Sequence, residues 1–177
     1  MDVTIIGLHH TVQWKDPTGE FQTLLEDLVR EYRVQLIAEE AYKLPTTVGC
    51  RLAYRANLQW VEIDLTDTER LQAGVEDELN NRPHRPLFDG NKVAVSYLAN
   101  ADGVREAHWV NRVMQHHVSS ALVICGVLHL SPLAAKFTNS GCIVKELNVC
   151  DQDWYKNAFG PCKIVEENGT RWCELSV

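Results

Sequence analysis

Two stretches decide how this sequence folds: VTIIGLHH at residues 3–10 and ALVICGVLH at residues 121–129. In each stretch an apolar, β-branched run ends at a glycine, and a histidine follows that glycine three residues later. A short, continuous apolar run that ends in a turn residue is typical of a buried strand in a parallel sheet. We therefore expect two such strands, each ending in a Gly-x-x-His turn where the glycine lets the backbone bend sharply.

Other parts of the chain show the alternation of strands and helices that accompanies such a sheet. Apolar runs at residues 34–38, 58–63 and 142–144 predict three more strands, residues 92–99 fit either a strand or a helix, and residues 83–90 are expected to form a loop. Helical patterns cover residues 17–32, a segment capped by Thr46 or Thr47, a polar stretch opened by the capping-box pair Thr66 and Glu69, residues 102–114 and residues 132–139. The pattern predicts an α/β fold: a mostly parallel β-sheet of roughly four to six strands, flanked by helices in three layers.

Length, charge and cysteine content limit the class of protein. We expect a single domain over residues 1–177, with residues 150–177 as an irregular C-terminal tail carrying a hairpin around Asn168 and Gly169. A net charge of −7 argues against a broad nucleic-acid surface. No apolar run approaches the roughly 20 residues of a membrane span, and the N-terminus lacks the basic start of a secretory signal, which predicts a cytoplasmic protein with no membrane partner. The six cysteines are then expected to be reduced thiols.

Polar residues gather where the predicted strands end. His10 and His129 follow the two glycine-terminated strands, Glu39 and Glu40 follow the second strand, and Asp64 follows the third. Ligands of parallel sheets bind outside the carboxyl ends of the strands, so these residues predict a site at that edge. A neutral histidine can accept a proton from water or bind a metal, and a neighbouring carboxylate fixes its tautomer and raises its basicity.

The sequence leaves two choices open within this site. His9 competes with His10, because adjacent residues in a turn point in different directions, and His10 is preferred. One of Glu39 and Glu40 is expected to act in the site, while the other only solvates a loop.

Two residues of the predicted helix at 102–114 complete the candidate site. Arg105 is expected to stabilise a developing oxyanion or hold a substrate carboxylate, and its alternative is a surface salt bridge with Glu106. Trp109 either lines the pocket or packs on the sheet. No Gly-x-Ser-x-Gly elbow surrounds Ser131, and Gly-x-Gly-x-x-Gly and Walker patterns are missing, which disfavours a serine hydrolase and a nucleotide-dependent enzyme.

Four stretches occur in a fixed order: IIGLHH at 5–10, LIAEE at 36–40, VRE at 104–106 and VICGVLH at 123–129. In this order and spacing, over most of residues 3–147, the chain resembles the Tiki/TraB superfamily, which includes the haem-binding protein ChaN and the erythromycin esterases. That superfamily contains metal-dependent proteases and metal-independent esterases, so the resemblance implies hydrolysis without fixing the substrate or the metal. The chain lacks the helical insertions that shape the substrate cleft of the esterases.

The combined hypothesis is a hydrolase of ester or peptide bonds that acts on a small molecule or a peptide. His10 or His129 is the predicted general base, Glu39 or Glu40 orients it, and Arg105 stabilises the anionic transition state.

Further residues are assigned to binding. His9, Asp64 and Trp109 are expected to contact the substrate. If a divalent metal is used, His10, His129 and Glu40 are its expected ligands, and the donor set favours manganese, cobalt or zinc. The alternative hypotheses are a haem- or metal-binding protein without turnover, and an interaction protein with a vestigial site.

Overall fold

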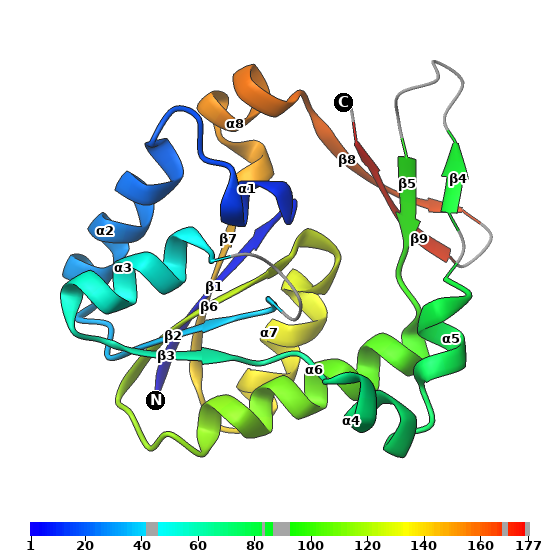
Figure 1. Cartoon of the computed structure of the whole chain (residues 1–177), viewed down its shortest axis with the longest axis horizontal. Helices are drawn as coiled ribbons and strands as arrows, with labels where there is room; N and C mark the ends of the chain where they lie inside the picture. Colours follow the sequence, from blue (N-terminus) through cyan, green and yellow to red (C-terminus); the bar gives the residue numbers. More distant parts are fainter. Residues whose placement is uncertain (42–45, 83, 87–92, 168–169, 176–177) are drawn as a thin grey trace.

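The computed structural model describes residues 1–41, 46–82, 84–86, 93–167 and 170–175. At its centre lies an all-parallel, five-stranded sheet with the strand order β3-β2-β6-β1-β7 (Figure 1). The strands are β1 (Asp2–Leu8), β2 (Leu36–Glu39), β3 (Gln59–Glu62), β6 (Ser120–Gly126) and β7 (Ile143–Asn148). The strands β1 and β6 are neighbours, with Gly7 opposite Cys125 and Leu8 opposite Gly126. The two Gly-x-x-His turns therefore leave the sheet side by side.

Helices cover both faces of this sheet, which confirms the predicted three-layer α/β fold. One face carries α1 (Thr11–Trp14), α2 (Glu20–Tyr32), α3 (Val48–Ala56) and α8 (Asp153–Phe159), and the other carries α6 (Ala99–Met114) and α7 (Leu130–Asn139). Alternate residues of a strand face opposite layers: Ile6 packs in the cluster with Phe21, whereas Ile5 packs in the cluster with Trp109 and Phe137. Full burial of each such side chain contributes about 1.5–3 kcal/mol, which makes this register strongly preferred.

A second sheet stands beside the first. It is antiparallel in the order β4-β5-β9-β8, with β4 (His84–Pro86), β5 (Val93–Ser96), β8 (Cys162–Glu167) and β9 (Thr170–Leu175). Hydrogen bonds link it to the elements around the second Gly-x-x-His turn. Tyr97 N–H donates to Arg171 O at 2.8 Å, and Arg171 Nη1 donates to Leu128 O at 3.5 Å.

The prediction of an irregular tail at residues 150–177 is wrong, because α8, β8 and β9 lie there. The predicted hairpin is confirmed by the antiparallel pairing of β8 with β9, although Asn168 and Gly169 lie outside the described residues. Part of the expected loop at 83–90 is the strand β4, and the remaining positions of that loop lie outside the described residues. Residues 92–99, for which the sequence left strand and helix open, contain β5 and the first residue of α6. Local patterns missed this sheet because β5 pairs with β9, a strand far away in the sequence.

The connections after β1 differ from the prediction. The α2 helix begins at Glu20, after Gly19 with φ of 74°, and not at residue 17. The Asp16 carboxylate still satisfies a first-turn amide, because it accepts the N–H of Gln22 at 2.8 Å. The short helix α1, which the sequence did not predict, begins directly after His10.

Two predicted helix caps are confirmed. Thr47 accepts the N–H of Cys50 at the start of α3, and Thr66 forms a capping box with Glu69 at the start of α4 (Asp67–Gln72). The polar helix is interrupted at Gly74, with φ of 69°, and continues as α5 (Glu76–Asn80). The segment from α4 to α5 packs near the carboxyl edge of the parallel sheet (Figure 1).

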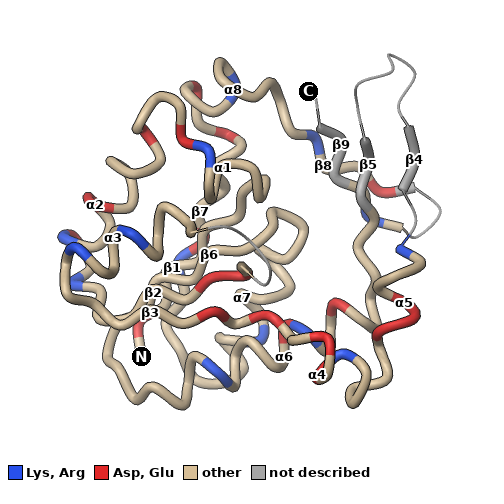
Figure 2. Tube along the Cα trace, viewed as in Figure 1, with Lys and Arg blue, Asp and Glu red and all other residues tan. Residues whose placement is uncertain are grey.

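Charged residues also mark this edge. Figure 2 shows acidic segments at the ends of β2 and β3, beside α4 and α6. Within the described part of the chain, no helix is both long and apolar enough to cross a membrane.

Candidate active site

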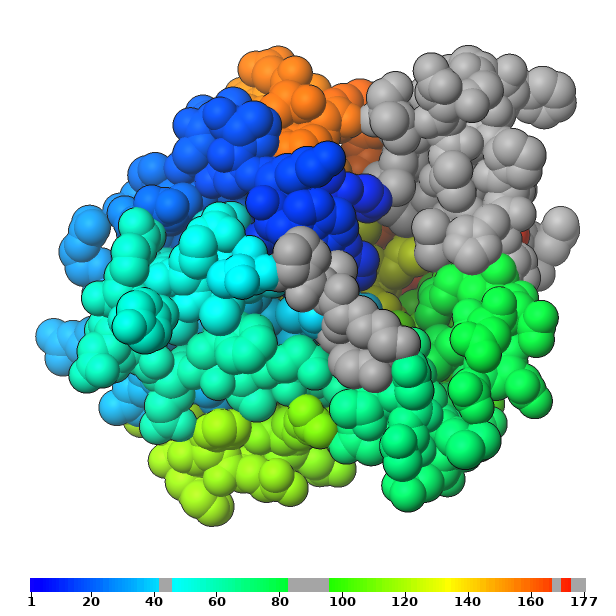
Figure 3. Space-filling model, viewed as in Figure 1, coloured from blue at the N-terminus to red at the C-terminus, as the bar shows by residue number. Residues whose placement is uncertain are grey.

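A pocket of about 290 Å³ lies at the carboxyl ends of β1, β2 and β6. Figure 3 shows a recess there, between the dark blue segment after β1 and the green α4–α5 segment. Its wall is formed by Leu8, His9, His10, Glu40, Arg70, Leu79, Arg82, Arg105, Gly126, Val127, Leu128 and His129. This volume lies at the lower limit of small-molecule sites, so the pocket fits a small ligand or one group of a larger one.

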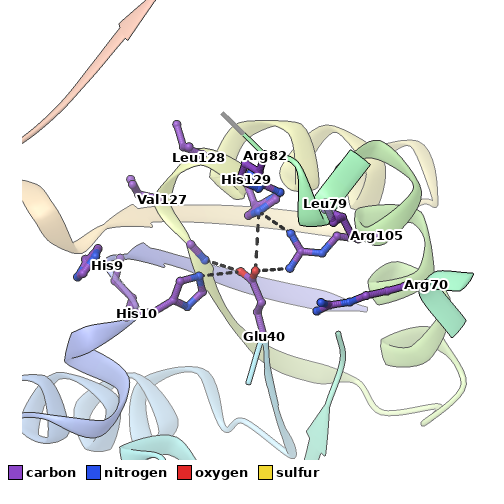
Figure 4. Close-up of a pocket in the computed structure, with 12 residues that line it drawn as sticks. His9, His10, Glu40, Arg70, Leu79, Arg82, Arg105, Val127, Leu128 and His129 are labelled. Carbon is purple, nitrogen blue, oxygen red and sulfur yellow. Dashed lines mark hydrogen bonds and ion pairs between the residues drawn. The ribbon is translucent and has the colours of Figure 1, made fainter. Parts of the chain in front are cut away.

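Glu40 stands at the centre of the site and connects both histidine turns (Figure 4). Its Oε2 accepts the N–H of Gly126 at 2.8 Å and lies 3.5 Å from His10 Nε2. Its Oε1 accepts from Arg105 Nη2 at 2.5 Å and lies 3.8 Å from His129 Nε2. Burial by itself would raise the pKa of Glu40, but electrostatic interactions with His10, Arg105 and His129, together with the hydrogen bond from the Gly126 amide, outweigh it and lower that pKa. Glu40 is therefore a permanent anion and a poor base.

The tautomer of His10 is set by Gln13 of α1. Gln13 Nε2 donates to the backbone carbonyl of Glu40 at 3.3 Å, and a carbonyl can only accept, so the amide oxygen of Gln13 faces His10. That oxygen lies 2.6 Å from His10 Nδ1, which must therefore carry the hydrogen. The other ring nitrogen, Nε2, then holds the lone pair of the neutral ring and faces Glu40.

His129 is held in a different way. Its Nδ1 lies 2.9 Å from the Glu106 carboxylate, which also accepts the Tyr97 hydroxyl at 3.0 Å. The rings of Trp109 and Tyr97 pack edge-on against the imidazole, with centroid distances of 4.8 and 5.8 Å. Because Glu106 accepts at Nδ1, His129 directs Nε2 towards Arg105 Nη1, 3.4 Å away.

The glycines of the two turns are needed because neighbouring atoms lie too close for a Cβ, and not because the backbone has an unusual φ there. Neither has a positive φ, so the turn after each strand uses a backbone conformation that other residues can also adopt. A Cβ on Gly126 would lie 3.0 Å from His10 Nε2, and one on Gly7 would lie 3.0 Å from the Cβ of Leu130. A side chain at Gly126 would therefore push into the contact between His10 and Glu40.

Arg105 does not have the predicted role. All five of its N–H groups have acceptors: Nε and Nη2 bind Asp64 at 2.9 and 3.0 Å, Nη1 binds Asp102 at 2.9 Å and faces His129, and Nη2 also binds Glu40. No donor is left for a substrate oxyanion. The alternative prediction, a surface salt bridge with Glu106, is also wrong, because Arg105 is buried and pairs with other carboxylates. Its role in the structure is to hold three acidic groups together.

Asp64 and Trp109 lie behind the pocket wall and not in it. Asp64 accepts from Arg105, from Arg70 at 2.8 Å and from the Trp109 indole at 3.2 Å. Trp109 is fully buried, so of the two readings of this residue, packing is correct.

Glu39 also lies outside the pocket. It precedes Glu40 at the end of β2, and successive side chains alternate between faces, so its carboxylate accepts from Thr47 and Trp60 at 2.5 and 2.6 Å on the α3 side. Burial raises the pKa of Glu39, although its hydrogen bonds, including those from Thr47 and Trp60, act in the opposite direction. Of the two glutamates, only Glu40 reaches the site.

His9 lines the pocket together with His10. Burial, and secondly the neighbouring His10, lower the pKa of His9 to about 4. His9 is therefore neutral and weakly basic near pH 7, whereas His10 makes the contact with the central carboxylate.

Sequence reasoning missed Gln13, Asp102 as a site residue, and Glu106. A signal for Asp102 and Glu106 was present in α6, because these two residues recur with Arg105 and Trp109 at helical spacing and all four are buried. Three charged residues on the core-facing stripe of a helix need partners inside the protein. Gln13 left no comparable signal, because α1 itself was not predicted.

The residues present do not fit the predicted metal site of His10, His129 and Glu40. Arg105 already supplies the cation on one Glu40 oxygen, and the Gly126 amide occupies the other. In the described ranges, no group of three or more His, Cys, Asp or Glu residues is arranged to hold a metal ion.

Comparisons with known proteins found no match for this chain among family models, curated proteins or solved structures. The resemblance to the Tiki/TraB superfamily therefore stays a prediction from the motifs.

Proposed function

We propose that this protein is a hydrolase in which His10 activates a water molecule for attack on an ester or peptide bond. One observation carries the proposal: His10 has its Nδ1 hydrogen fixed by Gln13, while its Nε2 faces an ionised glutamate 3.5 Å away at the wall of a pocket. When Nε2 is protonated, the resulting imidazolium forms an ion pair with the Glu40 carboxylate. Glu40 is therefore placed to pair with the imidazolium that forms when His10 takes a proton from water.

The other groups of the pocket are less suited to this role. The low pKa of Glu40 makes it a weak base, and the lowered pKa of His9 has the same effect. His129 is buried, and its Nε2 accepts from Arg105, which is a permanent donor. The side chain of His10 is 37% exposed, so it can meet water and a substrate.

The proton balance of the reaction closes on His10. Its Nε2 takes one proton from water as the water oxygen bonds to the carbonyl carbon of the substrate. The tetrahedral intermediate then breaks its bond to the leaving oxygen or nitrogen, and the imidazolium returns the proton to that atom. Glu40 stays ionised throughout and stabilises the imidazolium between the two transfers.

The test is an activity screen on a panel of esters and peptides with the wild type, His10→Asn and the control His116→Asn. Asparagine retains a donor for Gln13 but has no basic nitrogen. His116 is remote from the pocket and bonds to Gln59. Turnover that falls on the order of 10²- to 10⁴-fold only in His10→Asn supports the proposal. Equal rates in all three proteins refute it.

A parallel measurement separates the alternative hypotheses. The screen is repeated with a chelator, and the protein is titrated with haem and with zinc. Chelator-resistant turnover agrees with a water-activating histidine. A Soret band or stoichiometric metal binding without any turnover would instead support a binding protein.

A further inference from the structure

Two of the cysteines are in contact where the parallel sheet meets the antiparallel one. Cys150 belongs to the 3-10 turn η2 (Val149–Asp151), which follows β7, and Cys162 is the first residue of β8. Their thiols are hydrogen-bonded to each other. Cys162 also packs against the apolar cluster that contains Cys150 and Tyr155. Each sheet therefore contributes one thiol to the same buried contact.

The helix α8 brings these thiols together. Its seven residues separate η2 from β8, and it ends at Gly160, whose φ of 76° lies in the left-handed region that glycine tolerates. The chain enters β8 two residues later (Figure 1). Tyr155 of α8 is buried and is hydrogen-bonded to the Cys150 thiol. The contact between Cys150 and Cys162 is therefore built into the connection between the sheets.

The two thiols differ in their access to solvent. Cys150 is 1% exposed, whereas Cys162 is partly exposed. The hydrogen bond to Cys162, together with burial, raises the pKa of the Cys150 thiol, so Cys150 stays protonated at neutral pH. A small oxidant in solution can therefore reach Cys162 but not Cys150. An accessible thiol with a second thiol next to it is the arrangement of a redox-sensitive pair.

We propose that Cys150 and Cys162 are a redox-active pair that hydrogen peroxide converts into an intramolecular disulfide. Because the thiols are already hydrogen-bonded, they need little movement to reach the sulfur–sulfur bond length of about 2 Å. The disulfide closes a loop around α8 and fastens β8 to the end of β7. Neither cysteine lines the pocket, so this site does not depend on the proposed hydrolase function.

The oxidation balances in two steps. The Cys162 sulfur loses its proton to solvent and attacks one peroxide oxygen, so that an S–O bond forms, the O–O bond breaks, and the leaving hydroxide takes up a proton as water. The Cys150 sulfur then attacks the Cys162 sulfur. The S–S bond forms, the S–O bond breaks, and the leaving hydroxide takes the Cys150 proton to give a second water. The two thiols lose two electrons in total, and the peroxide gains them.

The first experiment treats the folded, full-length wild type with hydrogen peroxide, alkylates the remaining thiols and maps disulfides by peptide mass spectrometry. We expect a disulfide between Cys150 and Cys162 that dithiothreitol removes by thiol–disulfide exchange. If neither residue is oxidised, or if Cys162 pairs instead with Cys173 of the neighbouring strand β9, the proposal is wrong. The same treatment in urea should spread the disulfides over several pairings. An equal preference for this pair in urea would show that the fold does not direct it.

The second experiment assigns the role of each thiol. Cys150→Ala removes the resolving thiol, so sulfenic acid should accumulate at Cys162 and be trapped by dimedone. Cys162→Ala should leave the buried Cys150 unmodified. Cys142→Ala is the matched control and should form the disulfide at the wild-type rate, because Cys142 is also buried but contacts the Met114 thioether, at 3.6 Å, which cannot form a disulfide. Equal dimedone labelling of Cys162 in the wild type and in Cys150→Ala would overturn the proposal, since Cys150 would then not consume the sulfenic acid.

Discussion

The two Gly-x-x-His turns share a sequence pattern but not an environment. The side chain of His10 is 37% exposed, whereas that of His129 is 6% exposed. His10 bonds to the neutral amide of Gln13, and His129 bonds to the carboxylate of Glu106. The first turn continues into a four-residue helix at the pocket mouth, while the second continues into α7 and is covered by aromatic rings.

This difference shows that the motif places the imidazoles at one sheet edge, and the elements that follow decide their chemistry. Glu40 and Arg105 join the two turns into one site. Because His10 is partly exposed and bonds to a neutral amide, it can exchange protons with a ligand. Buried among carboxylates and rings, His129 anchors the site.

The largest expected effect comes from removing the group that joins both turns. Arg105→Met leaves the buried carboxylates of Glu40, Asp64 and Asp102 without their shared cation, which should cost about 3–5 kcal/mol of unfolding free energy. Urea denaturation at neutral pH measures this loss. Arg55→Met, at an exposed ion pair, should change stability by about 0.5 kcal/mol or less. Similar losses in both variants would show that the buried network does not stabilise the fold.

The second prediction concerns His10, whose substitution should affect turnover much more than stability. His10→Asn should lower kcat on the order of 10²- to 10⁴-fold while changing the unfolding free energy by about 1 kcal/mol or less, because His10 is the exposed partner. Steady-state kinetics and urea denaturation of one preparation provide both values. A loss of stability as large as that of Arg105→Met would mean that His10 is structural.

A smaller effect is expected from the amide that fixes the His10 tautomer. Gln13→Leu removes the acceptor for Nδ1 and should lower kcat on the order of 10- to 100-fold, with KM little changed, because the ring loses its orientation. Gln13→Glu restores an acceptor for Nδ1, but its carboxylate cannot donate to the Glu40 carbonyl as the amide does, so it should recover only part of the rate. If both variants lose the same activity, orientation is not the function of Gln13.

The buried turn should respond mainly in stability. His129→Leu leaves the Glu106 carboxylate without one donor in the core, which should cost about 1–3 kcal/mol. His129→Asn can place an amide donor where Nδ1 lies and should cost less. Thermal and urea unfolding of the two variants test this order, and the reverse order would contradict the assigned hydrogen bond.

The smallest effects concern the adjacent glutamates, which should show opposite pH dependence. The folded-state pKa of Glu40 is lowered, so its stabilising contribution is present above its unfolded pKa of about 4.3 and is lost as pH falls. The folded-state pKa of Glu39 is raised, so its contribution is greatest at acid pH and is lost as pH rises through that value.

Substitution by glutamine tests this contrast. As the pH rises from 3 to 7, it passes from below to above the unfolded pKa of about 4.3. Over this rise, the unfolding free energy of Glu39→Gln should increase relative to that of the wild type, and that of Glu40→Gln should decrease. Urea denaturation across this range measures both slopes. Slopes of the same sign would show that the two carboxylates share one environment.

Much of the parallel sheet could be read from local patterns. The strands around Ile6 and Ile124 are short, continuous apolar runs, and such runs have few alternatives to a buried parallel strand. The second sheet could not be read in this way, since β5 pairs with β9, a strand far away in the sequence. Polar residues on the inner stripe of α6 gave a usable signal for Asp102 and Glu106, and that signal was interpreted only as a helix cap and a surface partner.

The sequence by itself determined that the two Gly-x-x-His turns and the Glu39–Glu40 strand end lie at one edge, because parallel strands bring their carboxyl ends together whatever the details of packing. Only the tertiary structure decided which glutamate reaches the pocket, how Arg105 uses its donors, and which histidine is exposed. Those outcomes depend on the facing direction of single side chains and on partners such as Asp64, which binds Arg105 from a different element. Contacts of this kind between distant segments form only when the layers pack, so no local pattern contains them.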